Sequence, residues 1–421
     1  MKKRIIAIIF VSMLTVLPGL SGCSTMIHAE NLMKGVKADN AERDSGVDSE
    51  DSAVVTDFAV RLFQQSLKAD ESENVLISPL SVLYALGMTA NGAKGETLAQ
   101  MQEVLGLDVE ELNQYLYSYR QMLSEDEENT LNAANSIWFR DVESLTVEPD
   151  FLKTNANWYD AGIYKAPFDE STREDINHWV SDHTDGMIDQ ILEEPIERDV
   201  VMYLVNALAF DAEWEKIYEE NQVHDGTFTT ESGTVRNVEF MDSEEFGYLA
   251  DKDAAGFLKY YKGRKYAFAA LLPDEGVSIS EYTASLTGER VSQILNQPEQ
   301  TEVLVSMPKF ESEYSVKMND MLIGMGMNDA FDPVIADFTA LGHSREGNIY
   351  IGRVLHKTCI AVDEKGTKAG AATAVEMKVE SARIEPEEPK VVHLDRPFVY
   401  MLIDCENRVP IFIGTVLDIE E

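Results

Sequence analysis

Few residues in this chain have the types and spacing that catalysis or metal binding requires. His178 and His183 lie five positions apart in a helical pattern, so they do not share one helix face, and a solvated helix surface is the favoured interpretation. Gly324 and Gly326 begin a run that resembles a dinucleotide fingerprint, but the third glycine is missing and the run lies in a helical pattern. The sequence has no GxSxG, HExxH, P-loop or CxxC motif and no Cys/His cluster. We therefore predict no metal, no cofactor and no enzymatic activity.

The segment from Asp363 to Lys378, DEKGTKAGAATAVEMK, has the pattern of a strand and the composition of a loop. One set of alternating positions is small or apolar, and the other set holds every charge from 367 onward, which predicts a strand with one buried face. The glycines, the alanines and the prolines that follow are typical of a loop, so an alanine-rich surface loop with accidental phasing is the alternative. The small or apolar set is Thr367, Ala369, Ala371, Thr373, Val375 and Met377.

Composition limits the classes of protein to which the chain can belong. Of its 421 residues 44% are hydrophobic, which is ample for a packed core, and the formal net charge is -40. That charge argues against a nucleic-acid partner, because few basic side chains are available to neutralise phosphates. Predicted helices come mainly first and strands mainly later, without an internal repeat, so we expect one α+β domain.

The N-terminus predicts export. A basic start precedes a short apolar run over 5–17, and Leu20-Ser21-Gly22-Cys23 resembles the lipobox of bacterial lipoproteins. We therefore predict a lipoprotein signal peptide over 1–22, lipidation of Cys23 and an extracytoplasmic protein anchored to the bacterial cell membrane; the alternative is an ordinary signal peptide that contains a cysteine. The polar, aperiodic residues 23–52 are expected to form a flexible tether, followed by a folded domain over 53–421.

Several elements can be predicted from local patterns. Helical spacing begins at residue 53, and Ser78 before Pro79 predicts an N-cap and first turn of a second helix. Strands are expected over 130–140, 199–214 and 301–316, a helix over 317–327, and a hairpin whose strands 396–404 and 409–419 flank a turn. Cys359 and Cys405 lie in different apolar runs, so we expect small buried hydrophobic residues rather than a disulfide.

From about Ala53 to its end the chain resembles the serpins, in segments that follow one another in the family's order. These segments are NVLISPLSVLYALGMTANGAKGETLAQM, NAANSIWF, INHWVSDHTDGMI, VNALAFDAEWE, PKF, HKTCIAVDEKGTKAGAATA and DRPFVYMLIDCENRVPIFIGTV. The resemblance implies an α+β serpin fold with three β-sheets, eight or nine helices and an exposed reactive-centre loop near the C-terminus.

The resemblance also implies a mechanism for the segment that follows Asp363. A serine protease attacks the loop, forms an acyl-enzyme, and is trapped when the freed loop end inserts as a new strand of the main sheet. Counting about seventeen residues from Glu364 places the scissile bond at Glu380-Ser381, whereas counting back from Pro397 places it some six residues later. The other residues considered for this bond are Ala382, Arg383 and Ile384.

Other residues match serpin motifs one by one. The hinge of the inserting strand would comprise Glu364, Gly366, Thr367, Ala369, Ala371 and Ala372. A shutter beneath the sheet would comprise Ser78, Ser81, Asn206 and His356, which could equally be a helix cap and core polar residues. Lys309 would pair with Glu364 at the top of the sheet, the breach, near Trp214.

The resulting hypothesis is a lipid-anchored, monomeric suicide inhibitor of extracellular serine proteases of elastase-like, glutamate-preferring or trypsin-like specificity. The alternative is a non-inhibitory serpin that acts as a binding or carrier protein. Such members usually carry prolines or inward charges in the hinge, and this hinge has neither. An enzyme is the third and weakest candidate.

Overall fold

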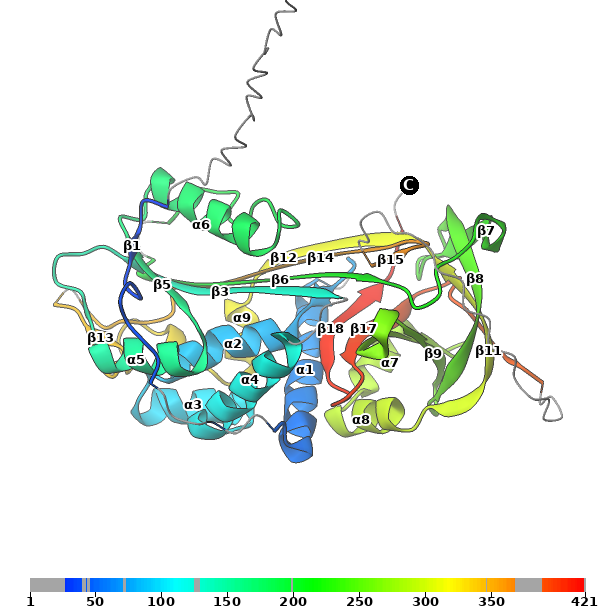
Figure 1. The fold of residues 1–421 in the computed structure, drawn as a ribbon, viewed down its shortest axis with the longest axis horizontal. Helices are drawn as coiled ribbons and strands as arrows, with labels where there is room; N and C mark the ends of the chain where they lie inside the picture. Colours follow the sequence, from blue (N-terminus) through cyan, green and yellow to red (C-terminus); the bar gives the residue numbers. More distant parts are fainter. Residues whose placement is uncertain are drawn as a thin grey trace, which may run out of the picture.

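The computed structural model describes residues 27–39, 43, 46–70, 73–124, 129–197, 200–345, 347–367 and 388–419. Within these residues the chain forms nine α-helices and three β-sheets of seven, nine and two strands. The predicted α+β fold with three sheets and eight or nine helices is confirmed. Figure 1 shows the long seven-stranded sheet above a layer of helices, with the nine-stranded sheet at one end of the molecule.

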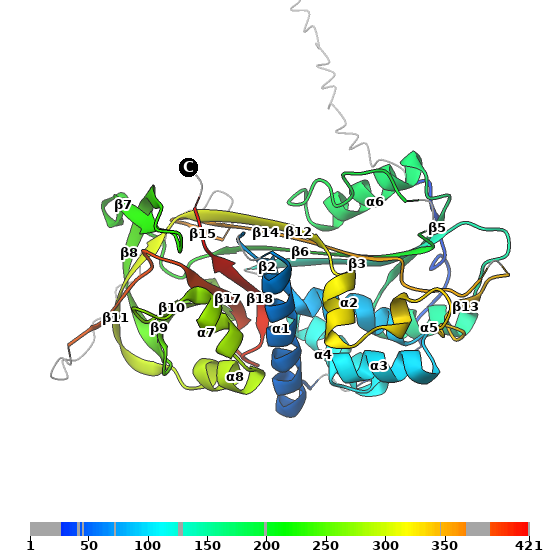
Figure 2. The same cartoon turned by 180° about the vertical axis from the view of Figure 1, so that it is seen from behind.

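The seven-stranded sheet is the framework for the candidate site. Its strands, in spatial order, are β1 (Glu30–Asn31), β5 (Gly162–Ala166), β3 (Thr130–Arg140), β6 (Met202–Glu213), β15 (Gly366–Thr367), β14 (Arg353–Val362) and β12 (Phe310–Lys317). The helix α6 (Glu170–His183) covers one face, and α2 (Pro79–Ala90) lies against the other (Figures 1 and 2). Both faces are thereby buried, which explains the near-continuous apolar sequence of β6.

The nine-stranded sheet contains the C-terminal hairpin. Its path is β16 (Lys390–His393), β11 (Glu299–Pro308), β8 (Val235–Ala250), β9 (Ala254–Tyr260), β10 (Tyr266–Pro273), β17 (Phe398–Asp404), β18 (Pro410–Val416) and β2 (Leu76–Ile77), while β7 (Val223–Thr229) pairs with β8. The antiparallel pairing of β17 with β18 confirms the predicted hairpin. The third sheet pairs β4 (Thr146–Val147) with β13 (Gly342–His343).

The prediction of one strand over 301–316 is wrong. The chain forms two strands there, β11 and β12, and they belong to different sheets. Pro308 ends the first strand, and Lys309 connects it to Phe310 at the start of the second. The buried positions change from odd numbers in β11 (Val303, Val305, Met307) to even numbers in β12 (Phe310, Ser312, Tyr314), so the alternation loses its phase at the junction. That loss of phase was the available signal of a break, although it does not indicate which sheet each strand joins.

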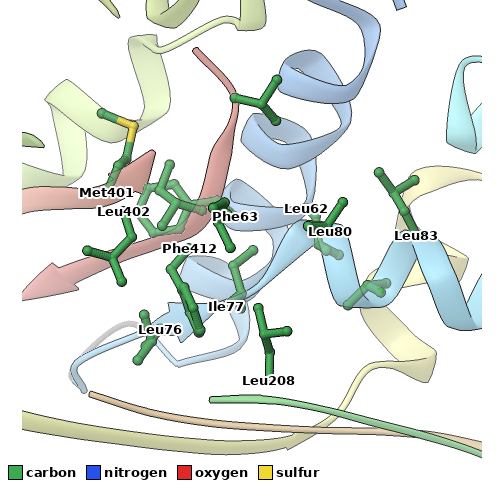
Figure 3. Close-up of a cluster of buried hydrophobic side chains, with 14 of the residues drawn as sticks. Leu62, Phe63, Leu76, Ile77, Leu80, Leu83, Leu208, Met401, Leu402 and Phe412 are labelled. Atoms are coloured by element: carbon green, nitrogen blue, oxygen red, sulfur yellow. The ribbon is translucent and has the colours of Figure 1, made fainter. Parts of the chain in front are cut away.

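The buried hydrophobic residues form a large cluster and a smaller one, and the smaller one includes Ile176 and Val180 of α6. The remaining helices are α1 (Ser49–Ala69), α3 (Gly95–Leu105), α4 (Val109–Ser124), α5 (Pro149–Trp158), α7 (Ile279–Ser285), α8 (Gly288–Asn296) and α9 (Asn319–Met325). Every residue of α2 is buried, because this helix lies inside the molecule; Figure 3 shows Leu80 and Leu83 of α2 in a cluster with Leu208 of β6 and Phe412 of β18. About 1.5–3 kcal/mol is gained for each such side chain that leaves water.

Three local predictions concern the cap of α2, the two histidines of α6 and the two cysteines. Ser78 caps α2 by accepting a hydrogen bond from the Ser81 amide, with Pro79 in the first turn, as predicted. His178 and His183 of α6 are both exposed, which confirms a solvated surface. Cys359 and Cys405 are free thiols as expected, although both are half-buried rather than buried.

The segment expected to be a flexible tether is partly docked. The strand β1 pairs with the edge strand β5, and the Asp175 carboxylate of α6 accepts hydrogen bonds from the amides of His28 (2.9 Å) and Ala29 (2.8 Å). The first helix also begins at Ser49, ahead of the expected boundary. Within the described part of the chain, no helix has the length and apolarity needed to cross a membrane.

Candidate functional site

The central feature of the large sheet is the seam between β6 and β14. In its lower part the two strands pair directly in parallel, from Arg353 opposite Tyr203 to Thr358 opposite Leu208. In its upper part β15 lies between them, and Gly366 and Thr367 pair with the end of β6. We call the directly paired stretch the lower part of the seam and the end near Glu213, where Gly366 and Thr367 lie between the two strands, its top.

A tight turn directs the chain into the seam. The Asp363 carboxylate accepts hydrogen bonds from the amides of Lys365 (2.7 Å) and Gly366 (3.1 Å), so the chain reverses directly after β14. A Cβ atom at position 366 would lie 2.0 Å from the Ala212 carbonyl oxygen, which only glycine avoids. Thr367 follows, fully buried, and its hydroxyl lies 2.5 Å from the Tyr261 hydroxyl.

Charged and aromatic residues surround the top of the seam. The Lys309 ammonium lies 2.9 Å from the Glu364 carboxylate and 3.2 Å from that of Glu239. The Lys309 hydrogen bond lowers the pKa of Glu364 below its ordinary value. Trp214 donates from its indole nitrogen to the Asp363 carbonyl (2.9 Å) and from its amide to the Lys365 carbonyl (2.8 Å). The structure thus brings Glu364, Lys309 and Trp214 together around the turn.

A buried ion pair beside this breach was missed in the sequence. The Lys259 ammonium lies 2.7 Å from the Glu245 carboxylate and over the rings of Tyr218 and Trp214. Burial opposes the charge on Lys259, but Tyr218 and Glu245 together leave its pKa raised. The available signal was a lone lysine in the otherwise apolar strand AAGFLKY; pairing is what makes a buried charge tolerable.

The four predicted shutter residues form one hydrogen-bonded cluster, and all four are fully buried. The Nε2 atom of His356 accepts from the Ser78 amide (3.1 Å), and its Nδ1 atom donates to Oδ1 of Asn206 (2.5 Å). The Ser81 hydroxyl donates to the same oxygen (2.7 Å). Asn206 in turn donates to Oδ1 of Asn135 (3.0 Å), a fifth member that sequence reasoning did not find.

The cluster joins α2 to both strands of the closed seam. Asn206 and His356 are cross-strand neighbours on β6 and β14, so their hydrogen bond lies across the seam itself. Burial lowers the pKa of His356 from 6.5 to about 3, because no carboxylate compensates the imidazolium there. The imidazole is therefore neutral at ordinary pH, and a strand entering the seam must separate it from Asn206.

Comparison with known families identifies the chain. The family model described as serpin (serine protease inhibitor) matches residues 53–419. The chain belongs to the serpin family. Among curated serpins, an uncharacterized serpin-like protein of Thermococcus kodakarensis is 30% identical over 86% of this chain and 84% of its own. Plasminogen activator inhibitor 1 of Bos taurus is 29% identical over 87% of this chain and 92% of its own.

One relative has been solved in two states, native and latent. The thermophilic serpin tengpin in its native state is 47% identical, with a TM-score of 0.87 over 93% of this chain and 100% of its own. The latent state of tengpin is 46% identical, with a TM-score of 0.78 over 90% of this chain and 100% of its own. The present serpin is thus more similar to the native form than to the latent form.

Several predicted residues lie outside the described part of the serpin. They are Cys23, the hinge residues Ala369, Ala371 and Ala372, and the reactive-bond residues Glu380, Ser381, Ala382, Arg383 and Ile384. Among the residues that the structure does describe, no group of three His, Cys, Asp or Glu could hold a metal.

Proposed function

We propose that this serpin inhibits serine proteases by suicide-substrate trapping. The observation that carries the proposal is the seam: a strand of two residues already lies between β6 and β14, directly above a stretch where these strands pair with each other. The strand β15 can be extended between β6 and β14 by the residues that follow Thr367. The relatives named as inhibitors, including leukocyte elastase inhibitor A of Mus musculus, give independent support.

The register of β15 supports insertion of the whole alternating segment. Gly366 lies opposite Glu213 and Thr367 opposite Ala212, in antiparallel pairing with β6. If the same register continues, Met377 comes opposite Met202, where β6 begins. The small or apolar set of the segment ends at that same residue. A strand of this pattern buries one face without burying a charge.

The same register gives the shutter a new partner. Thr373 would come opposite Asn206. Thr373 lies six residues after Thr367, and Asn206 lies six residues before Ala212, the cross-strand partner of Thr367. Because side chains alternate along a strand, Thr373 and Asn206 would point to the same face of the sheet as Thr367. When insertion separates Asn206 from His356, the Thr373 hydroxyl can take up a hydrogen bond that would otherwise be lost. Unsatisfied buried groups cost about 1–3 kcal/mol each, so this replacement lowers the barrier to opening.

The chemical step belongs to the protease. Its serine oxygen attacks the carbonyl carbon of the scissile bond, the peptide C–N bond breaks, and the new amine leaves with a proton, so that an ester joins the protease to the loop. We place this bond at Glu380-Ser381, because the count from the hinge sets how far the protease is carried. Arg383-Ile384 is the trypsin-like alternative, which would lengthen the inserted segment by three residues.

The test uses trypsin, a pancreatic elastase and a glutamate-specific endopeptidase. Each is incubated with the full chain, and a complex that survives denaturant is sought by electrophoresis. Mass spectrometry of the released C-terminal fragment should find Ser381, or a residue within two positions of it, at its N-terminus. A fragment that begins between Glu385 and Lys390 would favour the count from the C-terminal side. Simple cleavage by all three, without any stable complex and without a rise in melting temperature, would favour the carrier alternative.

We further propose that Cys23 carries the lipid anchor and that residues 1–22 are removed. The basic start, the short apolar run and Leu20-Ser21-Gly22-Cys23 support this, and an acyl chain contributes about 0.8 kcal/mol per buried CH₂. The variant Cys23→Ala should release the protein to the medium or leave an unprocessed precursor. Unchanged processing together with unchanged membrane retention would exclude the anchor.

A further inference from the structure

Three exposed apolar side chains share one face of the nine-stranded sheet. Phe246 of β8, Leu304 of β11 and Val391 of β16 are 57%, 38% and 68% exposed. Leu304 lies directly opposite Val391, and Phe246 lies opposite Glu302, two residues from Leu304 on the same face. We call these three residues the outer patch. Scattered apolar residues are common on surfaces, but neighbouring ones on adjacent strands form a continuous contact area.

Carboxylates border the outer patch. Glu244 lies opposite Leu304 and Glu302 lies opposite Phe246, both on the patch face of the sheet. The Asp242 carboxylate on the same face is paired with the His224 imidazole (3.0 Å). Lys390, at the start of β16, places its ammonium over the Tyr248 ring instead. An apolar centre with a charged rim is the usual anatomy of a protein interface. With a formal net charge of -40, two copies of this chain repel each other, so the partner that fits is a basic protein.

The position of the patch indicates which basic protein that is. The strand β16 begins at Lys390, nine residues after the proposed scissile bond. Nine residues span at most about 32 Å when fully extended. A globular protein of about 200 residues has a radius of gyration of about 16 Å, so its surface extends well beyond its active centre. A protease bound to the loop is therefore within reach of the patch.

We propose that the outer patch is a second contact surface for the target protease, which selects proteases with a basic surface and an apolar group beside the active-site cleft. This inference rests on the proposed inhibitory function. The loop then determines whether a protease can cleave, and the patch determines how fast it associates. Complementary charge acts mainly on the association rate, and desolvated aromatic contacts act mainly on the lifetime of the first complex.

The experiment measures the second-order rate of stable complex formation with the fastest-inhibited protease of the panel. Glu244→Lys with Glu302→Lys should slow it about tenfold at low ionic strength, and much less in 0.5 M salt. A chain with Phe246→Ser, Leu304→Thr and Val391→Thr should slow it about tenfold at both salt concentrations. Succinylation of the protease lysines, which reverses their charge and leaves the active-site serine free, should slow the wild type and spare the charge variant.

Matched controls separate the patch from general effects. Glu103→Lys with Glu174→Lys changes the net charge equally on exposed positions of α3 and α6. Val334→Thr with Ile335→Thr removes exposed apolar side chains elsewhere. Neither control should slow complex formation by more than about twofold.

Two further measurements distinguish the ways in which the inference could fail. Cleavage of a synthetic peptide spanning 364–390 reports loop specificity without the patch, and the melting temperature reports folding. Patch variants that fold and form complexes at the wild-type rate would overturn the inference and leave the inhibitory function intact. A wild-type chain that forms no complex with any protease of the panel would overturn both. Dimerisation through the patch, seen by sedimentation, would also overturn the inference.

Discussion

The top and the lower part of the seam between β6 and β14 differ in their side chains. At the top, beyond Thr358, Gly366 and Thr367 lie between the strands beside the charged pair Lys309–Glu364. In the lower part the strands pair with each other, and the side chains beside them form the uncharged hydrogen-bonded cluster of Asn206 and His356. The Lys309–Glu364 pair at the top is partly exposed, so water replaces its contacts when it opens. The cluster around Asn206 and His356 is fully buried, so each broken hydrogen bond needs a new partner. We therefore expect the seam to open more easily at its top than at the lower cluster, so that the lower cluster limits the rate of opening.

The largest expected effect comes from placing a charge where the inserted strand begins. Thr367→Arg should abolish the denaturant-resistant complex while cleavage of the loop continues, because a guanidinium would replace the buried Thr367 hydroxyl beside Tyr261. Lys365→Arg, which places arginine two residues away at an exposed position, is the matched control. Electrophoresis after mixing with protease measures both outcomes. A full yield of complex from Thr367→Arg would show that the seam accepts a charge at this buried position without loss of trapping.

The lower cluster should dominate the stability of the closed seam. Asn206→Ala removes the oxygen that accepts hydrogen bonds from Ser81 and His356 and the amide group that donates to Asn135. Because the His356 imidazole is fully buried, the free energy of unfolding should fall by about 2–4 kcal/mol. Spontaneous loop insertion, seen as loss of inhibitory activity on storage, should accelerate.

Asn177→Ala is the control for that variant. It removes a buried amide that binds the Ile191 and Leu192 amides, away from the seam. It should destabilise the protein without accelerating insertion. Equal acceleration in both variants would mean that the barrier reflects overall stability rather than the shutter.

Acid should affect the lower cluster before the upper one. The pKa of His356 is about 3 in the folded protein against an ordinary 6.5, so the unfolded chain binds the proton first as pH falls. Stability should therefore decrease from about pH 6.5 downward, by up to about 1.4 kcal/mol per pH unit from this group. The pKa of Glu364 is lowered from 4.5, so its contribution is present above that pH and is lost only below it.

Urea unfolding at a series of pH values measures these slopes. His356→Gln should remove the part of the slope between pH 6.5 and 4.5, and Glu364→Gln should leave that part unchanged. An identical pH dependence of the unfolding free energy in wild type and His356→Gln would show that His356 does not cause the loss of stability in acid.

A smaller effect is expected at Thr373. Thr373→Val should slow trapping and raise the fraction of loop that is cleaved without complex formation, because Asn206 would lose its new partner during insertion. The lost hydrogen bond should raise the free-energy barrier to insertion by about 1 kcal/mol. Thr373→Ser keeps the hydroxyl and should behave as wild type. Stopped-flow kinetics and the stoichiometry of inhibition compare the two, and equal behaviour of valine and serine would show that the register used here is wrong.

The smallest effect is expected at the top of the seam. A double-mutant cycle with Glu364→Gln and Lys309→Gln should give a coupling of about 0.2–1 kcal/mol in the free energy of unfolding, weaker in high salt, because the pair is partly exposed. A coupling above about 2 kcal/mol would remove the contrast between the two halves of the seam.

Local chemistry made part of this fold predictable. The strand β3 has the bounds that its apolar pattern indicates, and Ser78 with Pro79 begins α2, because capping involves only residues that are close in the chain. The shutter, hinge and breach residues came from family resemblance rather than from local pattern. The ion pair between Lys259 and Glu245 was not predictable, since the two residues lie on different strands and come together only because β9 and β8 are neighbours in the sheet.

Which segments alternate, which helices are capped and which residues around the seam are polar can be read from the sequence, because these properties depend on neighbours along the chain. The assignment of residues 301–316 to two different sheets and the docking of β1 on β5 depend on long-range packing. Long-range packing also places Gly366 and Thr367 in the seam while the strands below them stay paired. The reason is physical: backbone hydrogen bonds carry no side-chain signature, so the partner of a strand is selected by the packing of the whole molecule.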